Sequence, residues 1–511
     1  MKIKNIFCII LACLLVLCCC SCKKDNGEIQ KEEQETAIYT VNLLHCANDT
    51  YNPYTLTSKI NAEICSLLYD SLYVINNSFE PIPVLANNAK KDGNTWYVSF
   101  KNAKFSDSSP LTAEDIIYSF NLAKNCARYS TSLSHVSSVT ANGKELIFKL
   151  KYNDEFFINV LTFPILKAES DKLYNADNVL LPPIGTGEFV LNQEESCLDL
   201  NKNYFGKTGK VKKIFLKNAP DIESVSHYAS VGATDFYYAD TSEGSFVRMT
   251  AKKATVSRNV LVYLGLNDYV GILNNVNLRY AISAAISRQK IVTTAFYSNA
   301  TAATGPFHPN WQQTKDSQNT PSNEKKEISI ENLNKIGYNV LNAQGYFVNQ
   351  SGDTLELSLL VNSESPTKVA TASLIAASLK EVGIKINIRS VPYERYVKDL
   401  QNGNFQLYLG EVKIDNNFDI SALVLPGGKC AYGKRTADSY TAVSAQSVVT
   451  DYLNSKATFA NVITALQSEM PFIPICYRNG IVFYNESLEG DLEFFENDLF
   501  NCFNNLTINN Q

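Results

Sequence analysis

A strand, a turn and a capped helix follow one another directly between Trp96 and Lys124. Apolar and polar side chains alternate along Trp96–Phe100, which predicts a strand with one buried face. The serine- and proline-rich segment 106–110 favours a reversal of the chain. Thr112 and Asp115 then have the spacing of a capping box, and an apolar stripe follows them. A helix that buries one face is therefore expected to begin there.

A second unit, between Leu355 and Ile388, has the pattern of a parallel strand pair. Alternating leucines at 355–359 and alternating isoleucines at 384–388 predict two strands, and an apolar helical face spans Val369–Val382 between them. Such a unit joins parallel strands through a right-handed crossover. Together with hairpin-like strands elsewhere, it predicts an α/β protein with two lobes rather than one barrel.

Length and charge narrow the class of protein further. The 511 residues exceed what one hydrophobic core usually serves, so two or more compact units are expected. With 45% hydrophobic and 19% charged residues, the chain is expected to be globular. Its formal charge of -5 argues against a nucleic-acid partner.

The N-terminus has the pattern of a targeting signal. Lys2 and Lys4 precede an apolar run at 6–20, which is shorter than the roughly 20 residues needed to span a bilayer. The charged segment 23–35 has almost no apolar content and predicts a solvated tether.

The segment FSDSSPLTAEDII, residues 105–117, resembles a motif of the family 5 extracellular solute-binding proteins, the peptide and nickel receptors of ABC importers. Other segments resemble motifs of this family in the same order along the chain: Asn52-Pro53, Leu68–Leu72, Pro81–Ala86, Pro182–Phe189, Asn203–Gly206 and Asn277–Arg288. The resemblance extends over residues 40–485. One departure is Glu188, which stands where the family carries proline.

The resemblance implies a fold and a division of the chain. The expected fold is α/β, a two-lobed periplasmic-binding-protein-like fold of type II with an extra subdomain. Residues 1–21 would be a lipoprotein signal peptide and 22–37 a charged tether. The rest would divide into three parts: lobe I at 38–50, 168–264 and 477–511, an added subdomain at 51–167, and lobe II at 265–476.

The stretch Leu17–Cys22 resembles a bacterial lipobox, which implies that Cys22 is lipidated and anchors the protein to the bacterial cell membrane. Cys20 is the alternative acceptor, and a plain secretory signal is the alternative form of processing. On either path the mature protein would be extracytoplasmic.

Binding is favoured over catalysis. The four histidines lie far apart, and nucleophile-elbow, phosphate-loop and dinucleotide motifs are missing, so we expect no enzymatic activity, no cofactor and no metal site. The resemblance implies a monomeric substrate-binding lipoprotein of an ABC importer. It would capture oligopeptides in an interlobe cleft and deliver them to permease subunits. A receptor for a non-peptide solute, or a surface enzyme or adhesin on the same fold, is the alternative.

The resemblance also suggests ligand contacts in the first half of the chain. The loop of Thr57 and Lys59 matches the family's first ligand-contacting loop. Tyr263 and Asn267 lie where a crossing strand is expected to meet the cleft.

Further contacts are suggested near the C-terminal end. The segment GEVKID stands where the family carries a tryptophan that stacks on ligand and an aspartate that pairs with a peptide amino terminus. Here Glu411 replaces the tryptophan, and Asp415, or else Asp419, replaces the aspartate. This departure admits another cationic or polar ligand. Tyr477 and Arg478, in a late strand, complete the predicted contacts.

Seven of the 13 cysteines lie beyond the signal and anchor: Cys46, Cys65, Cys126, Cys197, Cys430, Cys476 and Cys502. An odd number permits at most three disulfides and leaves one unpaired thiol in a monomer. We interpret them as scattered buried thiols, since no closely spaced pair indicates zinc or redox chemistry.

Overall fold

The computed structural model describes residues 39–240, 251–315, 325–435 and 444–509, all within one compact unit, residues 38–511. The predicted signal peptide, the cysteine expected to carry lipid and the tether lie outside the described residues. Among the described residues, no helix combines the length and apolar character that crossing a membrane requires.

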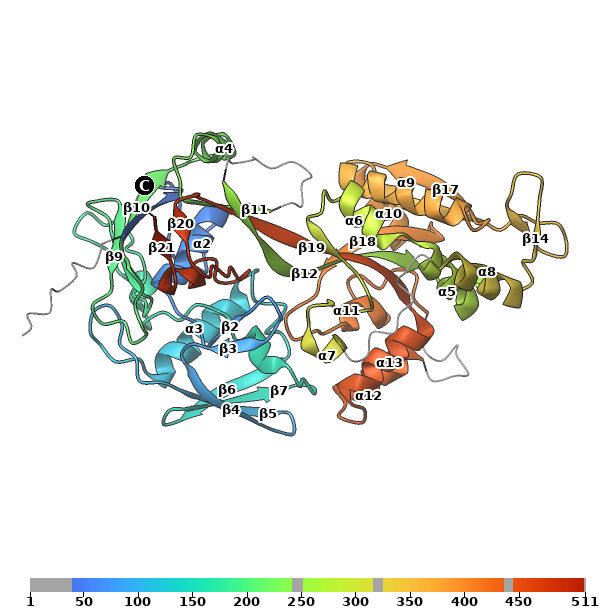
Figure 1. Cartoon of the computed structure of the whole chain (residues 1–511). Coiled ribbons are helices and arrows are strands. Elements are labelled where there is room, and N and C mark those ends of the chain that lie inside the picture. Colours follow the sequence, from blue (N-terminus) through green and yellow to red (C-terminus); the bar gives the residue numbers. More distant parts are fainter. Residues whose placement is uncertain (1–38, 241–250, 316–324, 436–443, 510–511) are drawn as a thin grey trace, which may run out of the picture. The chain divides into compact units, whose positions relative to one another are not determined.

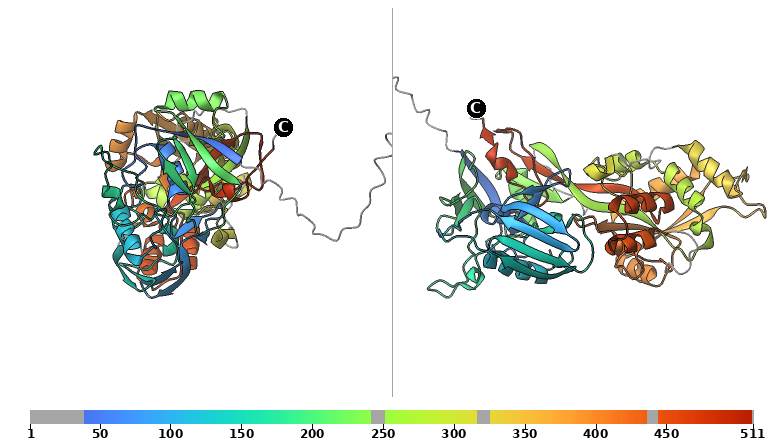
Figure 2. Two further views of the ribbon diagram at one scale, coloured as in Figure 1. Left: turned by 90° about the vertical axis from the view of Figure 1, so that its left-hand side faces the viewer. Right: turned by 90° about the horizontal axis from the view of Figure 1, so that it is seen from below.

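The largest sheet is built around two long antiparallel strands. β12 (Lys252–Leu266) and β19 (Phe472–Tyr484) run side by side (Figure 1, Figure 2), with register shifts between Ser257 and Val260 and between Val262 and Tyr263. The strand order is β11-β19-β12-β18-β16-β17, and β13 also pairs with β19. The other strands are β11 (Phe236–Asp240), β13 (Ala300–Ala302), β16 (Glu356–Asn362), β17 (Lys385–Val391) and β18 (Leu407–Lys413).

The predicted parallel unit is confirmed. β16 and β17 pair in parallel, with Leu359 opposite Ile388, and α9 (Pro366–Lys380) lies between them in sequence. Leu357, Leu359 and Val361 pack with the helix in one core.

The two faces of the large sheet are covered by different helices, because successive side chains of a strand point to opposite faces. Val262 and Leu264 pack with α5, α6 and α9. Leu261 and Tyr263 pack in a second core with α11, α12 and α13. These helices are α5 (Val276–Ala285), α6 (Arg288–Thr294), α11 (Ser421–Val424), α12 (Ala445–Leu453) and α13 (Phe459–Glu469).

A four-stranded sheet of order β1-β10-β9-β8 forms a separate core. β1 and β10 are parallel, and α2 packs against their apolar side chains together with Phe500 and Phe503 from the C-terminal segment. The bounds are β1 (Tyr39–His45), α2 (Lys59–Leu68), β8 (Phe189–Asn192), β9 (Cys197–Leu200) and β10 (Val211–Asn218).

The predicted strand, turn and capped helix belong to another four-stranded sheet, β4-β5-β7-β6. This sheet, in blue and teal, faces the viewer in the view from below in Figure 2. The capping box is confirmed, since the Thr112 hydroxyl accepts from the Asp115 amide at 3.4 Å and the Asp115 carboxylate accepts from the Thr112 amide at 2.9 Å. The bounds are β4 (Ala86–Asp92), β5 (Thr95–Phe100), α3 (Ala113–Asn125), β6 (Val136–Asn142) and β7 (Glu145–Leu150).

The remaining described elements are short. The strands are β2 (Tyr73–Ile75), β3 (Pro81–Pro83), β14 (Val340–Leu341), β15 (Phe347–Val348), β20 (Leu488–Glu489) and β21 (Thr507–Ile508). The helices are α4 (Ile222–Ser230), α7 (Gln312–Lys315), α8 (Lys326–Lys335) and α10 (Tyr393–Gln401). The short 3-10 helices are η1 (Phe157–Val160), η2 (Ser170–Lys172), η4 (Gly271–Asn274) and η6 (Asn501–Asn504). The division into lobe I, subdomain and lobe II at the boundaries given above stays a prediction.

Close packing across β12 and β18 predicts the effect of one substitution. Gly265 lies opposite Tyr408, and an added Cβ would come within 1.9 Å of the Tyr408 ring. We expect Gly265→Ala to lower the free energy of unfolding by about 1–3 kcal/mol, because the buried ring must move. Gly271→Ala is the matched control, since a Cβ there meets open space. Equal urea midpoints for the two variants would contradict this packing.

Candidate functional site

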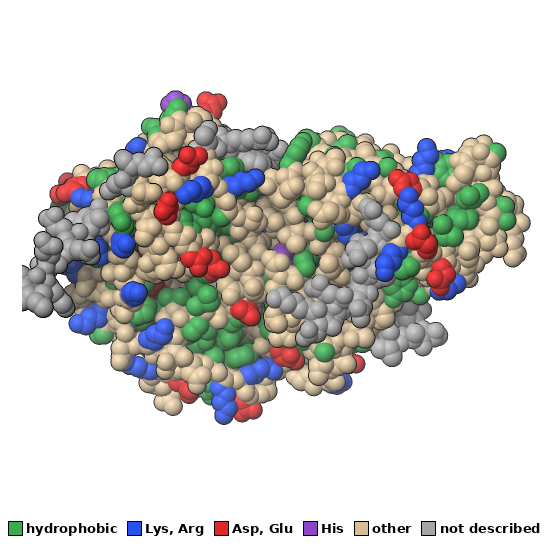
Figure 3. Space-filling view, viewed as in Figure 1, with side chains coloured by type: hydrophobic (Ala, Val, Ile, Leu, Met, Phe, Trp, Pro, Cys, Tyr) green, Lys and Arg blue, Asp and Glu red, His purple; other side chains and the backbone are tan. Residues whose placement is uncertain are grey.

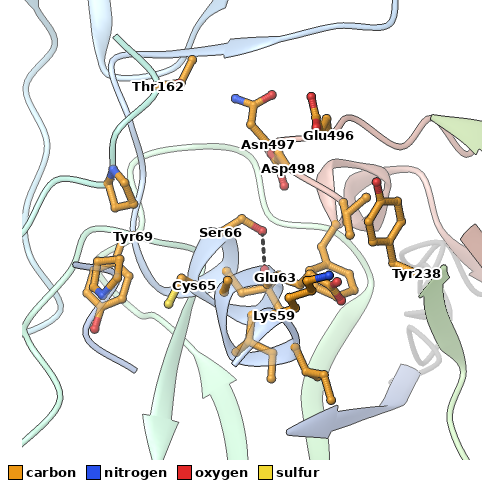
Figure 4. A pocket seen from close by; sticks show the side chains of 18 of the residues that line it. Lys59, Glu63, Cys65, Ser66, Tyr69, Thr162, Tyr238, Glu496, Asn497 and Asp498 are labelled. Carbon is orange, nitrogen blue, oxygen red and sulfur yellow. Dashed lines mark hydrogen bonds between the residues drawn. The ribbon is translucent and has the colours of Figure 1, made fainter. Parts of the chain in front are cut away.

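A cavity of about 1470 Å³ opens beside α2 (Figure 4). Its lining comes from segments far apart in the sequence: α2, the β2–β3 hairpin, residues 257–258 of β12, Lys413 at the end of β18 with residues 415–416 after it, and the C-terminal segment 496–504. A molecule in this cavity would therefore contact several parts of the fold at once.

The position of α2 is fixed at its N-terminus by Asp49. The Asp49 carboxylate accepts from the amides of Thr57 and Ser58 at 2.8 and 2.5 Å, and the Ser58 hydroxyl caps the helix by accepting from the Asn61 amide. Burial opposes ionisation of Asp49, but these backbone donors outweigh it and hold its pKa below the ordinary value. The helix then projects Lys59, Glu63 and Ser66 as Figure 4 shows, and all three line the cavity.

A glycine-containing turn brings two more polar side chains to the C-terminal end of α2. An added Cβ at Gly185 or Gly187 would come within 2.1 or 2.4 Å of backbone atoms at that end, so only glycine allows this approach. Thr186 lies between the two glycines, and its hydroxyl donates to Asp70 at 2.8 Å. Glu188 follows the second glycine, and its carboxylate accepts from the Gly209 amide at 3.1 Å.

Besides Asp415, four carboxyl groups of the lining have raised pKa values, because burial disfavours their charged forms. Burial raises the pKa of Asp70 to about 6 and the pKa values of Glu188 and Asp498 to about 7. The neighbouring charge of Asp70 adds to the shift at Glu188 and Asp498. Burial also raises the pKa of Glu63 to about 8, despite the nearby Lys59. These groups would ionise more readily beside a bound cation.

The pKa of Glu496 is lowered and not raised, because two cations lie beside its carboxylate. Its Oε1 lies 3.2 Å from Arg258 Nε and 3.2 Å from Lys413 Nζ. Burial alone would raise the pKa of Glu496, but the charges of Lys413 and Arg258 lower it. All three side chains line the cavity, so this part of the lining carries two cations and one anion.

The side of the cavity formed by the β2–β3 hairpin is apolar. Val74, Ile82, Val84 and Val160 line it, and Ile82 keeps 37% of its surface exposed. Figure 3 shows apolar side chains gathered over the region of this hairpin. The cavity thus combines an apolar wall with charged groups of both signs.

The structure brings three of the eight predicted contact residues to this cavity. Thr57 and Lys59 line it near the N-terminus of α2, and Asp415 lines it from the distant segment that follows β18. Asp415 is half-buried, and burial raises its pKa despite the opposing effects of the Ser132 hydroxyl and Lys413. Asp419, the alternative to Asp415, lies outside the cavity lining and beside Tyr152.

The structure places three other predicted contacts in the interior. Tyr263 is 2% exposed, and its hydroxyl lies 3.2 Å from that of Tyr408. The Asn267 amide donates to the backbone oxygens of Gly403 and Phe405, and the Tyr477 hydroxyl donates to that of Pro306. These side chains do not line the described cavity.

Glu411 and Arg478 lie together but also outside the cavity lining. Glu411 Oε2 is 3.3 Å from Arg478 Nη1 and 3.5 Å from Lys368 Nζ. The Arg478 guanidinium also lies over the ring of Phe296. The acid that replaces the family's tryptophan is therefore engaged in an ion pair within the protein.

Several lining residues were not predicted from the sequence. The sequence marked Glu188 as unusual, because it stands where the family carries proline. Its proximity to Asp70 could not be predicted, because it depends on how the turn packs against α2. Asp498 and Glu496 lie beyond the part of the chain that resembles the family, and Arg258 belongs to no quoted motif. No sequence signal marked these three residues.

The seven described cysteines are all free thiols. Cys46 and Cys65 line the cavity, and Cys65, Cys197, Cys476 and Cys502 are buried. In the described part of the chain, no group of three or more His, Cys, Asp or Glu side chains is arranged to hold a metal ion.

The raised pKa of Asp498 predicts a pH-dependent effect of removing its charge. The unfolded carboxyl ionises near pH 4 and the folded one at about 7, so the folded state holds an extra proton between these values. The contribution of Asp498 to stability therefore falls as pH rises from 4 to 7. We expect Asp498→Asn to gain stability relative to wild type over this window, by on the order of 1 kcal/mol per unit of pKa shift.

Urea unfolding of both proteins at pH 5 and pH 8 measures this difference. Asp177→Asn is the control, because Asp177 is exposed and lies outside the cavity lining. A difference between Asp498→Asn and wild type that stays constant with pH would show that Asp498 titrates normally.

Comparison with known proteins places this geometry in a family. Residues 80–432 match the family model described as bacterial extracellular solute-binding proteins, family 5 Middle. The chain is 23% identical over 488 residues to the oligopeptide-binding protein AppA of Bacillus subtilis, covering 88% of each chain. It is 22% identical over 492 residues to the nickel-binding periplasmic protein of Escherichia coli, covering 88% of this chain and 90% of that protein.

The fold agrees with solved structures. NikA from Brucella suis, in complex with Fe(III)-EDTA, superposes with a TM-score of 0.67 at 16% identity, over 92% of this chain and 100% of that one. The predicted α/β fold class is thereby confirmed. Family 5 proteins are extracytoplasmic transport receptors that bind small peptides or other solutes and work with ABC permeases, and they are not enzymes. The chain belongs to family 5 of the bacterial extracellular solute-binding proteins and is a substrate-binding protein of an ABC importer.

Proposed function

We propose that the protein captures an oligopeptide in the cavity beside α2 and delivers it to its permease. The cavity carries the proposal, since 1470 Å³ exceeds the roughly 300–1,000 Å³ of pockets for drug-sized molecules. A peptide of several residues offers charged ends, backbone amides and apolar side chains to such a lining. The Bacillus subtilis relative is named an oligopeptide-binding protein, which supports this ligand class.

The charges of the lining suggest how a peptide is held. The carboxyls of Glu63, Asp415 and Asp498 suit its cationic amino end, and Arg258 and Lys413 suit its carboxylate. A bound amine would favour the ionised carboxyls and lower their pKa values. Peptide binding would then release protons and become tighter as pH rises through the range in which these groups titrate.

Capture and delivery depend on a conformational change. A ligand that contacts both sides of a cleft stabilises the closed form, because it gains those contacts only there. We propose that the closed, monomeric receptor is the form that the permease recognises. A lipid on Cys22 would keep it at the outer face of the membrane.

A nickel complex is the second candidate ligand, because the Escherichia coli relative is named a nickel-binding periplasmic protein. The described residues offer no ready-made group of three metal ligands. Such a ligand would therefore bring part of its own coordination sphere.

A thermal-shift and calorimetric titration with a pool of tri- to hexapeptides tests the proposal. A peptide at 100 times its dissociation constant should stabilise the fold by about 2.7 kcal/mol. Stabilisation by a nickel chelate, with no response to any peptide, would contradict the peptide proposal and favour the second candidate.

The substitution Asp415→Asn tests the amino-end contact. We expect it to weaken binding of peptides with a free amino terminus about tenfold, which corresponds to about 1.4 kcal/mol, and to leave N-acetylated peptides unaffected. Asp177→Asn should bind as wild type does. Equal calorimetric affinities for Asp415→Asn and wild type would remove Asp415 from the site.

A further inference from the structure

Two phenylalanines from the part of the chain that carries the β4–β7 sheet insert into a different core. Phe79 lies in the loop between β2 and β3, and Phe156 precedes η1. Their neighbours Tyr73 and Phe157 belong to the core of the β4–β7 sheet. Phe79 and Phe156 instead pack in the core that covers one face of the large sheet. The two cores are thus joined through aromatic side chains.

The ring contacts are close and numerous. The ring centroid of Phe156 lies 5.0 Å from those of Trp311 and Phe459 and 6.3 Å from that of Phe418. The centroid of Phe79 lies 5.9 Å from that of Phe418, and Trp311 stacks on Phe418 at 3.5 Å. Such distances are those of favourable aromatic pairs.

Hydrogen bonds surround these rings. The amide of Asn153 donates to the Leu453 oxygen at 2.8 Å, and the amide of Glu155 donates to the Tyr452 hydroxyl at 3.0 Å. The Asn417 side chain donates to Asp154 at 2.7 Å. The Asn159 side chain donates to the Asn416 oxygen at 3.0 Å and to the Phe79 oxygen at 3.3 Å. Both polar and apolar contacts therefore hold the same junction.

The backbone at this junction is strained. Phe79 and Phe418 have φ angles of 60° and 59°, in the left-handed region that costs a non-glycine residue roughly 1–2 kcal/mol. Such a conformation persists only where the surrounding structure imposes it. Each of the two residues lies in a local turn, because the Phe79 amide donates to the Asn76 oxygen at 2.9 Å and the Phe418 amide donates to the Asp415 oxygen at 2.8 Å. Their rings meet across the junction.

The junction also borders the ligand cavity. Phe79 and Asn416 line the cavity, and Asp415 precedes Asn416 directly. A change at the junction would therefore move one wall of the cavity.

We propose that Phe79 and Phe156, packed against Trp311, Phe418 and Phe459, form an aromatic latch that shifts the ligand-free receptor toward the closed form, which ligand then stabilises further. The proposal rests on the receptor function proposed above, in which opening and closing control access to the cavity. The aromatic packing and the hydrogen bonds around it hold the latch shut. The fraction of closed protein then sets the apparent affinity for ligand.

Hydrogen exchange and small-angle X-ray scattering of the ligand-free protein test the latch. We expect Phe156→Ala to accelerate amide exchange in residues 152–159 and 415–420 by about tenfold or more, because the substitution removes the ring that packs against Trp311, Phe418 and Phe459. The radius of gyration should increase, while β12 and β19 keep their protection. Phe215→Ala is the matched control, since Phe215 is 41% exposed on β10 and lies outside this core.

Phe156→Leu is a milder variant, because it keeps an apolar side chain at position 156. It should change amide exchange and the radius of gyration in the same direction but by less. Unchanged exchange and radius of gyration in both Phe156 variants would overturn the latch. Rapid exchange of these two segments in the wild type would overturn it as well. Neither measurement uses a peptide, so the latch and the peptide ligand are tested separately. If the latch is intact but no peptide binds, only the proposed ligand is contradicted.

Discussion

The antiparallel pairing of β12 with β19 is the constraint on which the rest of the structure depends. These strands pair from Lys252 with Tyr484 to Gly265 with Phe472, so one continuous ladder runs through the largest sheet. The ladder loses its regular register between Ser257 and Val260, and Ser257 and Arg258 at this irregularity line the cavity. The irregular part of the ladder therefore lies beside the cavity.

The pKa of each carboxyl group in the cavity depends on the groups that surround it. Asp70, Glu188 and Asp498 lie where burial dominates, so their pKa values rise. Glu496 is buried too, but Arg258 and Lys413 lie 3.2 Å away and reverse the direction of the shift. Carboxyl groups within one cavity thus have pKa values shifted in opposite directions. Carboxyls without a strong cationic partner are the groups whose ionised form a nearby cation would stabilise most.

Local patterns in the sequence predicted local structure well. The capping box at Thr112 and the parallel unit around α9 depend on residues within one or two turns or strands, and both are confirmed. Periodicity predicted two α/β lobes, and the resemblance to family 5 supplied the type of two-lobed fold. The site was harder to predict from the sequence, because it is assembled from segments such as α2 and residues 496–498, which are more than 400 residues apart. Glu411 shows the limit clearly: its pairing with Arg478 and Lys368 depends on strand register and helix placement that no motif encodes.

We propose that a peptide occupies the cavity between α2, the β2–β3 hairpin and residues 413–416. A crystal structure of the protein with a peptide drawn from the titrated pool tests this most directly. We expect density for an extended chain in contact with Glu63 or Asp498 at one end and with Arg258 or Lys413 at the other. Density for the peptide elsewhere, for example over Glu411 and Arg478 with the cavity beside α2 left empty, would contradict it.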